Sequence, residues 1–264
     1  MDEFLYVEEV LCYGDTLPIA YHSALEVLQQ APIVPCPDWN TNQKEISVTM
    51  VVGNPLKEPM ISKLSFCDPD SLEQYRQEML DGILDFEIDK GNWVYTYHNR
   101  MTAYPIRTDH KIDYANQVNF VIDELKRNPY SRRAVIDIRD NSDDMYSDDP
   151  ACWQHAQFFI RDNKLYMKVL FRSNDACKAA FMNAFALIML QKRIADELGV
   201  EMGTYTHRAN SFHCYERDFD MLDGYVNRIA RGSDVTYSYE DDWKELMEDA
   251  RPEIAKKVEI LKNK

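Results

Sequence analysis

The chain has 264 residues, of which 45% are hydrophobic, and its formal net charge at pH 7 is −15. This length is sufficient for one large globular domain or two small ones. The acidic charge argues against general binding to nucleic-acid phosphates, although a local arginine cluster can still bind a small anion. No apolar run reaches the ~18 residues of a membrane span.

The N-terminal half is predicted to contain helices and a strand separated by proline-rich or glycine-rich breaks. β-Branched side chains favour the strand, and helical spacing of apolar residues favours the helices. The predicted elements are a partly helical segment over 1–31, an extended link over 32–37, a strand over 46–52, a helix over 71–84 capped by Ser71 with Leu72, Tyr75, Met79 and Ile83 on one face, and a helix over 113–127.

The C-terminal half is predicted to mix strands and helices without strict alternation, which favours one α+β domain with a mixed or mostly antiparallel sheet packed by helices. The predicted elements are a strand over 134–138, an acidic surface loop over 139–150, a hairpin of strands 157–160 and 165–171, a helix over 175–198 ending at Gly199, a strand over 211–215, and a helical region over 239–261 interrupted near Pro252.

Six cysteines are present, and none belongs to a C-x-x-C pair. The start of the sequence lacks the basic region of a signal peptide. We therefore expect a reducing, cytoplasmic location, with no metal site and no membrane partner. Cys152 follows Asp149-Pro150-Ala151 at a predicted junction of loop and strand, where a thiolate can act as a nucleophile. A buried structural cysteine is the alternative for this residue alone.

Two segments carry residues suited to an anion. Arg132 and Arg133 are adjacent at a predicted strand start and can present planar forks to a phosphate. Arg172 and Ser173 precede Asp175 at a predicted helix start, where backbone N–H groups add to the positive potential. The alternatives are a solvated sheet edge for the arginine pair and an ordinary first-turn acid for Asp175.

Three further residues can bind a nucleotide. Asn183 lies within an apolar helix, and its amide offers both a donor and an acceptor, which match the N3–H and C4 carbonyl of uracil. His213 and Tyr215 alternate along a predicted strand and so point the same way, as needed to bind a sugar hydroxyl. The alternatives are an asparagine bonded to nearby backbone and a half-buried strand edge.

Together these motifs resemble the thymidylate synthase superfamily. Arg132 and Arg133 lie 20 and 19 positions before Cys152, while Arg172, Asn183 and His213 lie 20, 31 and 61 positions after it. The resemblance is strong over 128–220, and residues 1–60 and 222–264 match poorly. Segment 93–97 is similar to the family's Val-Tyr strand, with Tyr95 as its tyrosine. The helical glutamate of the family corresponds to Glu78.

The resemblance implies a single catalytic domain over 1–264, with its core over about 40–240, and a homodimer formed through the sheet face. It implies that Cys152 attacks C6 of the pyrimidine, that Asn183 holds the O4 edge, and that Glu78 relays protons through water. Tyr95 is an implied active-site residue. Arg172 is implied to lower the pKa of the Cys152 thiol. The co-substrate is 5,10-methylenetetrahydrofolate, and no metal is required.

The remaining implied roles concern substrate binding. Arg172 and Ser173, with Arg132 and Arg133 of the partner subunit, hold the 5′-phosphate. The sugar 3′-hydroxyl binds the two residues of the His-x-Tyr motif, and the pterin faces the residues at the start of the predicted helix. These are His213 and Tyr215 for the sugar, and Asp175 and Ala179 for the pterin.

The sequence departs from the family at several positions. Trp153 replaces a common histidine, Ala179 replaces a common glycine, the family's N-terminal phosphate-binding arginine has only Lys44 as its nearest candidate, and the C-terminus is polar. We predict reductive methylation of dUMP to dTMP. The alternatives are hydroxymethylation of dUMP, dCMP or CMP without folate oxidation, and a non-catalytic module that binds nucleotides or RNA. Asn183 favours uracil, because cytosine-specific members carry an aspartate there.

Overall fold

The computed structural model describes residues 9–264. Its main sheet contains β1 (Glu9–Gly14), β2 (Ile33–Cys36), β3 (Thr41–Val52), β7 (Val135–Asp137), β8 (Trp153–Arg161), β9 (Lys164–Phe171), β10 (Asn174–Asp175) and β11 (Glu201–Tyr215). Two small sheets pair β4 (Ile61–Ser62) with β12 (Thr236–Tyr237) and β5 (Tyr104–Arg107) with β6 (Ile112–Ala115). The helices are α1 (Leu17–Gln30), α2 (Pro69–Asp81), α3 (Phe86–Asp89), α4 (Tyr97–Thr102), α5 (Gln117–Arg127), α6 (Asn141–Asp144), α7 (Ala180–Leu198), α8 (Phe219–Ala230) and α9 (Lys244–Lys262).

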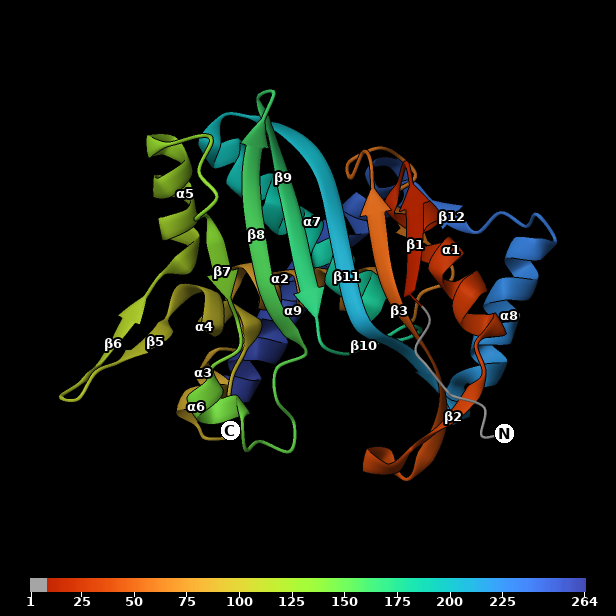
Figure 1. Ribbon diagram of the computed structural model, residues 1–264, viewed down its shortest axis with the longest axis horizontal. Coiled ribbons are helices and arrows are strands. Elements are labelled where there is room, and N and C mark those ends of the chain that lie inside the picture. The colour runs from red at the N-terminus through yellow and green to blue at the C-terminus, as the bar shows by residue number, and fades with distance from the viewer. Residues whose placement is uncertain (1–8) are drawn as a thin grey trace.

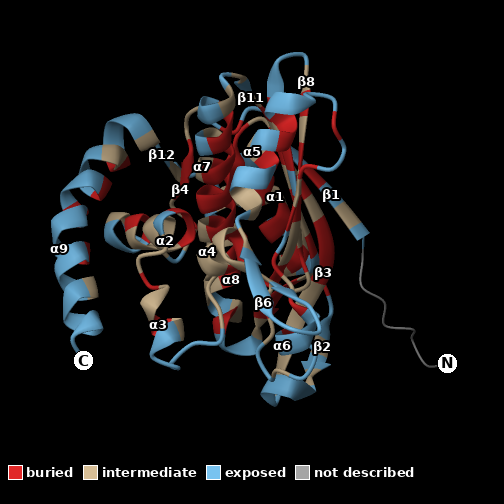
Figure 2. Ribbon diagram, turned by 90° about the vertical axis from the view of Figure 1, so that its left-hand side faces the viewer, coloured by how far each residue is buried: buried red, intermediate tan, exposed pale blue. Residues whose placement is uncertain are grey.

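The main sheet is mixed and follows the order β1-β3-β11-β9-β8-β7, with β2 added beside β3 and β10 beside β11 (Figure 1). The pairs β1–β3 and β9–β11 are parallel, whereas β3–β11, β8–β9 and β7–β8 are antiparallel. The long helices lie on one side of this sheet, and no long helix of the described chain covers the other face (Figure 2). The predicted α+β fold with a mixed sheet packed by helices is confirmed.

The chain path brings the start of β8 and the ends of β9 and β11 together at one end of the sheet. Asp162 and Asn163 join β8 to β9 with φ values of 50° and 57°, as a two-residue hairpin turn requires, and they confirm the predicted hairpin. From β9 the chain crosses through α7 into the parallel strand β11. The start of β8 therefore lies beside the end of β9, with Trp153 opposite Phe171, and β10 pairs with the end of β11.

The core fills the space between the sheet and the helices. Alternate residues of β8 and β9 are buried, as a period of two requires for a strand with one covered face. More residues are buried in α7 than in any other helix within 9–264, and they include Phe181, Phe185 and Ile188. None of the helices within 9–264 is long and apolar enough to cross a bilayer.

Helix α2 begins earlier than predicted, because Asp68 rather than Ser71 is its N-cap. The Asp68 carboxylate accepts a hydrogen bond from the Ser71 amide at 2.8 Å, and the Ser71 hydroxyl accepts one from the Asp68 amide at 3.0 Å. This reciprocal capping box satisfies two N–H groups that a helix start leaves unpaired. The helix ends at Gly82, whose φ of 63° is left-handed.

Three other predicted helix limits were wrong. Residues 113–115 belong to β6, so α5 starts at Gln117. Asp175 lies in β10, where it pairs with His213, so α7 starts only at Ala180. Pro252 does not interrupt α9, which continues to Lys262 with Pro252 on its exposed side. The prediction of a partly helical segment over 1–31 is confirmed by α1, and its first eight positions lie outside the described residues. The predictions of strand 46–52 and of Gly199 as a helix stop are also confirmed.

Two predicted segments differ in character. The expected strand over 93–97 is absent; the chain turns there, and Thr96 caps α4 by accepting a hydrogen bond from the Asn99 amide at 2.9 Å. The expected surface loop over 139–150 contains α6 and is anchored by a buried ion pair, in which Arg100 contacts Asp140 at 3.1 Å. This anchor fixes the start of the loop that leads to Cys152.

Candidate functional site

A cavity of about 950 Å³ opens where β8 starts, where β9 and β11 end, and where α7 begins. It gathers side chains from segments that are far apart in the sequence. Most of the residues singled out from the sequence line it, namely Cys152, Arg172, Ser173, Asp175, Ala179, Asn183, His213 and Tyr215. Such a concave site with converging polar groups is the usual form of a ligand-binding site.

Cys152 is held at the cavity by Arg172. The Arg172 amide donates to the Cys152 carbonyl oxygen at 2.8 Å. The guanidinium of the same residue donates to the carbonyl oxygens of Ala151 at 3.0 Å and Pro150 at 2.5 Å. Arg172 therefore holds the loop that carries the thiol, because its planar guanidinium can donate to two carbonyl oxygens at once.

Burial raises the pKa of the Cys152 thiol above its ordinary value, while the charge of Arg172 lowers it and Asp149 adds a smaller rise. The expected lowering influence of Arg172 is present, but burial outweighs it. Desolvation disfavours the thiolate because the charged form loses more hydration than the neutral thiol. Most of this thiol is therefore protonated at neutral pH.

The segment between β9 and α7 forms the floor of the cavity. The Asp175 carboxylate accepts hydrogen bonds from the amides of Cys177 at 3.0 Å and Lys178 at 2.9 Å. The Ser173 hydroxyl lies 3.5 Å from Nδ1 of His213. These hydrogen bonds, with the pairing of β10 and β11, hold Ser173 and Asp175 at the same end of the sheet as the loop that carries Cys152.

Asn183 is buried, with 5% of its surface exposed. It lies in the first turns of α7, where its backbone N–H donates to the Ala179 carbonyl oxygen at 2.9 Å. Its side-chain Oδ1 accepts a hydrogen bond from the hydroxyl of Tyr75 on α2. Tyr75 lines the same cavity. The sequence placed Tyr75 on one helix face with Leu72, Met79 and Ile83 but did not identify it as a site residue.

His213 and Tyr215 point to the same side of β11, as their alternation predicts. Their rings lie 4.8 Å apart in an edge-on arrangement. Burial lowers the pKa of His213 below its ordinary value, so the imidazole is neutral at physiological pH and offers one donor and one acceptor. A neutral imidazole beside a phenol is suited to a hydroxyl group.

A second cavity of about 460 Å³ adjoins the first and contains Glu78 and Tyr95. The two cavities share Tyr75 and Tyr97 in their linings. Burial raises the pKa of Glu78, and the Gln74 amide, which donates to its carboxylate at 2.8 Å, partly opposes this. A carboxyl group with a raised pKa is suited to proton transfer near neutral pH.

Tyr97 is a site residue that the sequence argument missed. Its hydroxyl accepts a hydrogen bond from the Trp153 amide at 3.2 Å, directly after the candidate nucleophile. Tyr95 lies beside it, with the ring centroids 5.9 Å apart, but lines only the second cavity. The repeated Tyr-x-Tyr spacing was the available signal for Tyr97.

Three predicted cations lie elsewhere in this chain. Arg132 and Arg133 are exposed in the loop before β7 and do not line either cavity, and the Arg133 guanidinium contacts the Glu124 carboxylate at 3.1 Å. Lys44 donates to the carbonyl oxygen of Gln29 and is not in the lining either. The cations that do line the main cavity are Arg172 and Lys178, which pairs with Asp218 at 2.7 Å.

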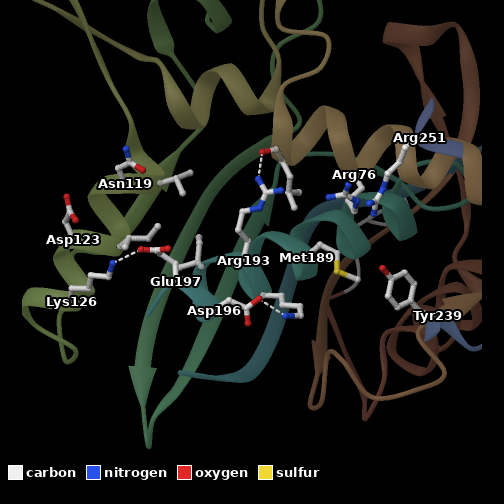
Figure 3. Close-up of a pocket in the computed structure, with 15 residues that line it drawn as sticks. Arg76, Asn119, Asp123, Lys126, Met189, Arg193, Asp196, Glu197, Tyr239 and Arg251 are labelled. Carbon is white, nitrogen blue, oxygen red and sulfur yellow. Dashed lines mark hydrogen bonds and ion pairs between the residues drawn. The ribbon is translucent and has the colours of Figure 1, made fainter. Parts of the chain in front are cut away.

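A third hollow, of about 940 Å³, lies among α2, α5, α7 and α9 and is lined by several basic side chains (Figure 3). Each of these cations already has a carboxylate partner; the pairs are Arg76 with Glu73, Arg193 with Asp81, Lys126 with Glu197, Lys192 with Asp196, and Arg251 with Glu73. An anion would have to displace these partners, so this hollow is a poorer anion site than the cavity at Arg172.

Comparison with known proteins adds independent findings. A family model described as thymidylate synthase matches residues 68–253. A protein of Methanocaldococcus jannaschii is 38% identical over 197 residues, which cover 71% of this chain and 83% of that protein. A protein of Methanosarcina mazei is 30% identical over 186 residues, which cover 70% of this chain and 79% of that protein. Both relatives bear the name "Putative thymidylate synthase".

Proposed function

Because this chain belongs to the thymidylate synthase family, we propose that it converts dUMP to dTMP by one-carbon transfer to C5 of the base. The observation that carries this proposal is the common cavity of Cys152, Arg172, Asn183 and His213. These residues supply a nucleophile, a phosphate ligand, a base-reading amide and a sugar ligand within one site.

In the proposed reaction the Cys152 thiolate adds to C6 of uracil, and C5 becomes nucleophilic as negative charge develops toward O4. The Asn183 amide, buried in the cavity wall, is the group that stabilises this charge. Glu78, whose pKa is raised by burial, transfers protons through water from the adjoining cavity. Tyr95 contributes to this cavity's wall.

Substrate binding follows from the remaining residues. The nucleotide 5′-phosphate binds Arg172 and Ser173, which line the same cavity as Cys152. Its negative charge forms charge-assisted hydrogen bonds with the Arg172 guanidinium. His213 and Tyr215 bind the 3′-hydroxyl. The six cysteines are all free thiols, which agrees with a reducing, cytoplasmic location.

In the proposed complex the co-substrate occupies the adjoining cavity. When bound, 5,10-methylenetetrahydrofolate supplies the one-carbon unit and, in the methylating reaction, the hydride that reduces it. Trp93 and Tyr95 give this cavity flat aromatic surfaces, and the Glu78 carboxyl group can accept a hydrogen bond from a pterin N–H group. Asp175 and Ala179, in the lining of the main cavity, are the proposed pterin contacts from the α7 side.

Product analysis tests the reaction. We expect the chain, given dUMP and 5,10-methylenetetrahydrofolate, to form dTMP and dihydrofolate in equal amounts, detected by mass spectrometry and by dihydrofolate absorbance. Incubation without the folate is the control. Conversion of dUMP to a hydroxymethylated product without dihydrofolate would show that methylation is the wrong step.

Hydroxymethylation is the second candidate, and the C-terminal helix is the observation that favours it. Methyl transfer requires water to be kept from the intermediate. The end of α9 packs away from the site, where the Leu261 carbonyl oxygen accepts a hydrogen bond from Lys90 at 2.6 Å. No residue of α9 lines the cavity of Cys152. The same assay, extended to dCMP and CMP, distinguishes the two products and the base.

We also propose that the active form is a homodimer in which Arg132 and Arg133 reach the partner's phosphate site. Both are exposed and lie outside their own chain's cavity. The sheet face opposite the helices is open (Figure 2), and its edge strand β1 exposes Leu11 and Tyr13 by 71% and 64%. An open face with exposed apolar residues suits an interface that repeats by twofold symmetry.

Subunit mixing tests this arrangement. We expect the Cys152→Ala protein and an Arg132→Ala/Arg133→Ala double variant to be inactive alone. Unfolded together and refolded at equal amounts, they should recover about a quarter of wild-type activity, because half of the dimers are mixed and each mixed dimer has one intact site. Equal amounts of either variant refolded alone are the controls. An absence of recovery would mean that the arginines act within their own chain or not at all.

A further inference from the structure

The cavity contains a hydrogen bond whose direction bears on the choice of base. The Tyr75 hydroxyl on α2 donates to Oδ1 of Asn183 on α7. Tyr75 lines both cavities, and Asn183 lines the one that contains Cys152. Helices α2 and α7 pack against each other, so the backbones of Tyr75 and Asn183 are held in place. What can still change is the rotation of the Asn183 side-chain amide.

The phenol proton determines which end of the amide faces Tyr75. A partly buried hydroxyl needs an acceptor, and within residues 9–264 the Asn183 amide oxygen is the acceptor that the Tyr75 hydroxyl has. Burial and the nearby Glu78 raise the pKa of Tyr75, so this hydroxyl stays protonated and remains a donor at neutral pH. With its oxygen toward Tyr75, the amide turns its NH₂ group away from it.

The two pyrimidines require opposite amide orientations. Uracil presents a donor at N3 and an acceptor at O4, whereas cytosine presents an acceptor at N3 and a donor at its 4-amino group. In the observed orientation the NH₂ group can donate to O4, and the second lone pair of Oδ1 can accept from N3–H. In a flipped amide, as cytosine requires, the NH₂ group would donate to the Tyr75 oxygen, and the Tyr75 hydroxyl proton would lose the acceptor that it has in Oδ1.

We propose that the Tyr75 hydroxyl fixes the amide of Asn183 in the orientation that accepts uracil and rejects cytosine. Tyr75 is then a positioning residue for base selection, since it acts through Asn183. This inference rests on the proposed function, in which the base of a pyrimidine nucleotide lies against Asn183.

The test is the base preference of Tyr75→Phe, which removes the hydroxyl and keeps the ring. We expect kcat/KM for dUMP to fall about fivefold to tenfold, and the ratio of kcat/KM for dUMP over dCMP to fall by about an order of magnitude, because one oriented hydrogen bond is lost. The affinities of dUMP and dCMP for Cys152→Ala and for Cys152→Ala/Tyr75→Phe, measured by calorimetry, should shift in the same direction without any turnover.

Tyr97→Phe is the matched control, because its hydroxyl bonds to the Trp153 amide rather than to Asn183; its base ratio should stay that of the wild type even where its rate falls. Tyr75→Met, which lacks the hydroxyl but has another shape, should repeat the change in ratio. An unchanged ratio in both Tyr75 variants of an enzyme that converts dUMP overturns the inference alone. A wild-type chain that neither binds nor converts dUMP overturns the proposed function and this inference with it.

Discussion

Replacement of Cys152 by alanine is expected to lower the turnover of dUMP by at least about three orders of magnitude, because the variant lacks the only step that activates C5. The thiol lies in the common cavity, and its loop is clasped by Arg172 rather than buried in the apolar core. Binding of dUMP should survive, since the phosphate, sugar and base ligands are unchanged. Product formation by mass spectrometry and dUMP affinity by calorimetry give the two readouts.

Cys67→Ala is the matched control. Cys67 is also a partly buried free cysteine, but it lies outside both cavities, and its replacement should leave turnover near the wild-type rate. Turnover by Cys152→Ala equal to that of the wild type would contradict covalent catalysis at this residue. A wild-type chain that binds dUMP but never converts it would instead favour the non-catalytic, nucleotide-binding alternative.

The sequence was sufficient to predict most of the residues around the cavity, because each of them belongs to a short motif at a strand end or a helix start. It could not predict Tyr75, although its position on one face of a predicted helix was apparent. Helical spacing identifies a side chain that points inward, but the same spacing applies whether that side chain meets the core or a cavity. The hydrogen bond to Asn183 joins residues 108 positions apart and becomes visible only in the fold.

Long-range pairing also explains the wrong boundaries. The helical pattern around Asp175 is locally reasonable, yet Asn174 and Asp175 instead pair with β11 and delay the start of α7. For the same reason the sequence identified Arg172 as a partner of the Cys152 thiol but could not weigh its charge against burial. The net rise in the pKa of Cys152 depends on how much solvent the folded loop excludes.

Replacement of Arg172 by alanine is expected to lower kcat/KM for dUMP by about two to three orders of magnitude, because it removes a phosphate ligand and both side-chain hydrogen bonds to the loop. It should also change the pH dependence of the thiol. The thiolate is the reactive form, and the positive charge of Arg172 lowers the pKa of Cys152. Without that charge the pKa rises further, so reactivity appears only at higher pH.

The rate of Cys152 alkylation by iodoacetamide, followed against pH by mass spectrometry, measures this ionisation without any turnover. In the wild type we expect the midpoint to lie above that of an ordinary free cysteine, since burial dominates, and in Arg172→Ala to lie higher still. Arg172→Lys separates the two contributions: it keeps the positive charge, so the midpoint should move less, but it lacks the fork that spans the Pro150 and Ala151 carbonyls, so kcat/KM should remain low. Identical alkylation profiles in the wild type and Arg172→Ala would contradict the electrostatic role, because a charge that contacts this loop cannot be removed without changing the free energy of the thiolate it faces.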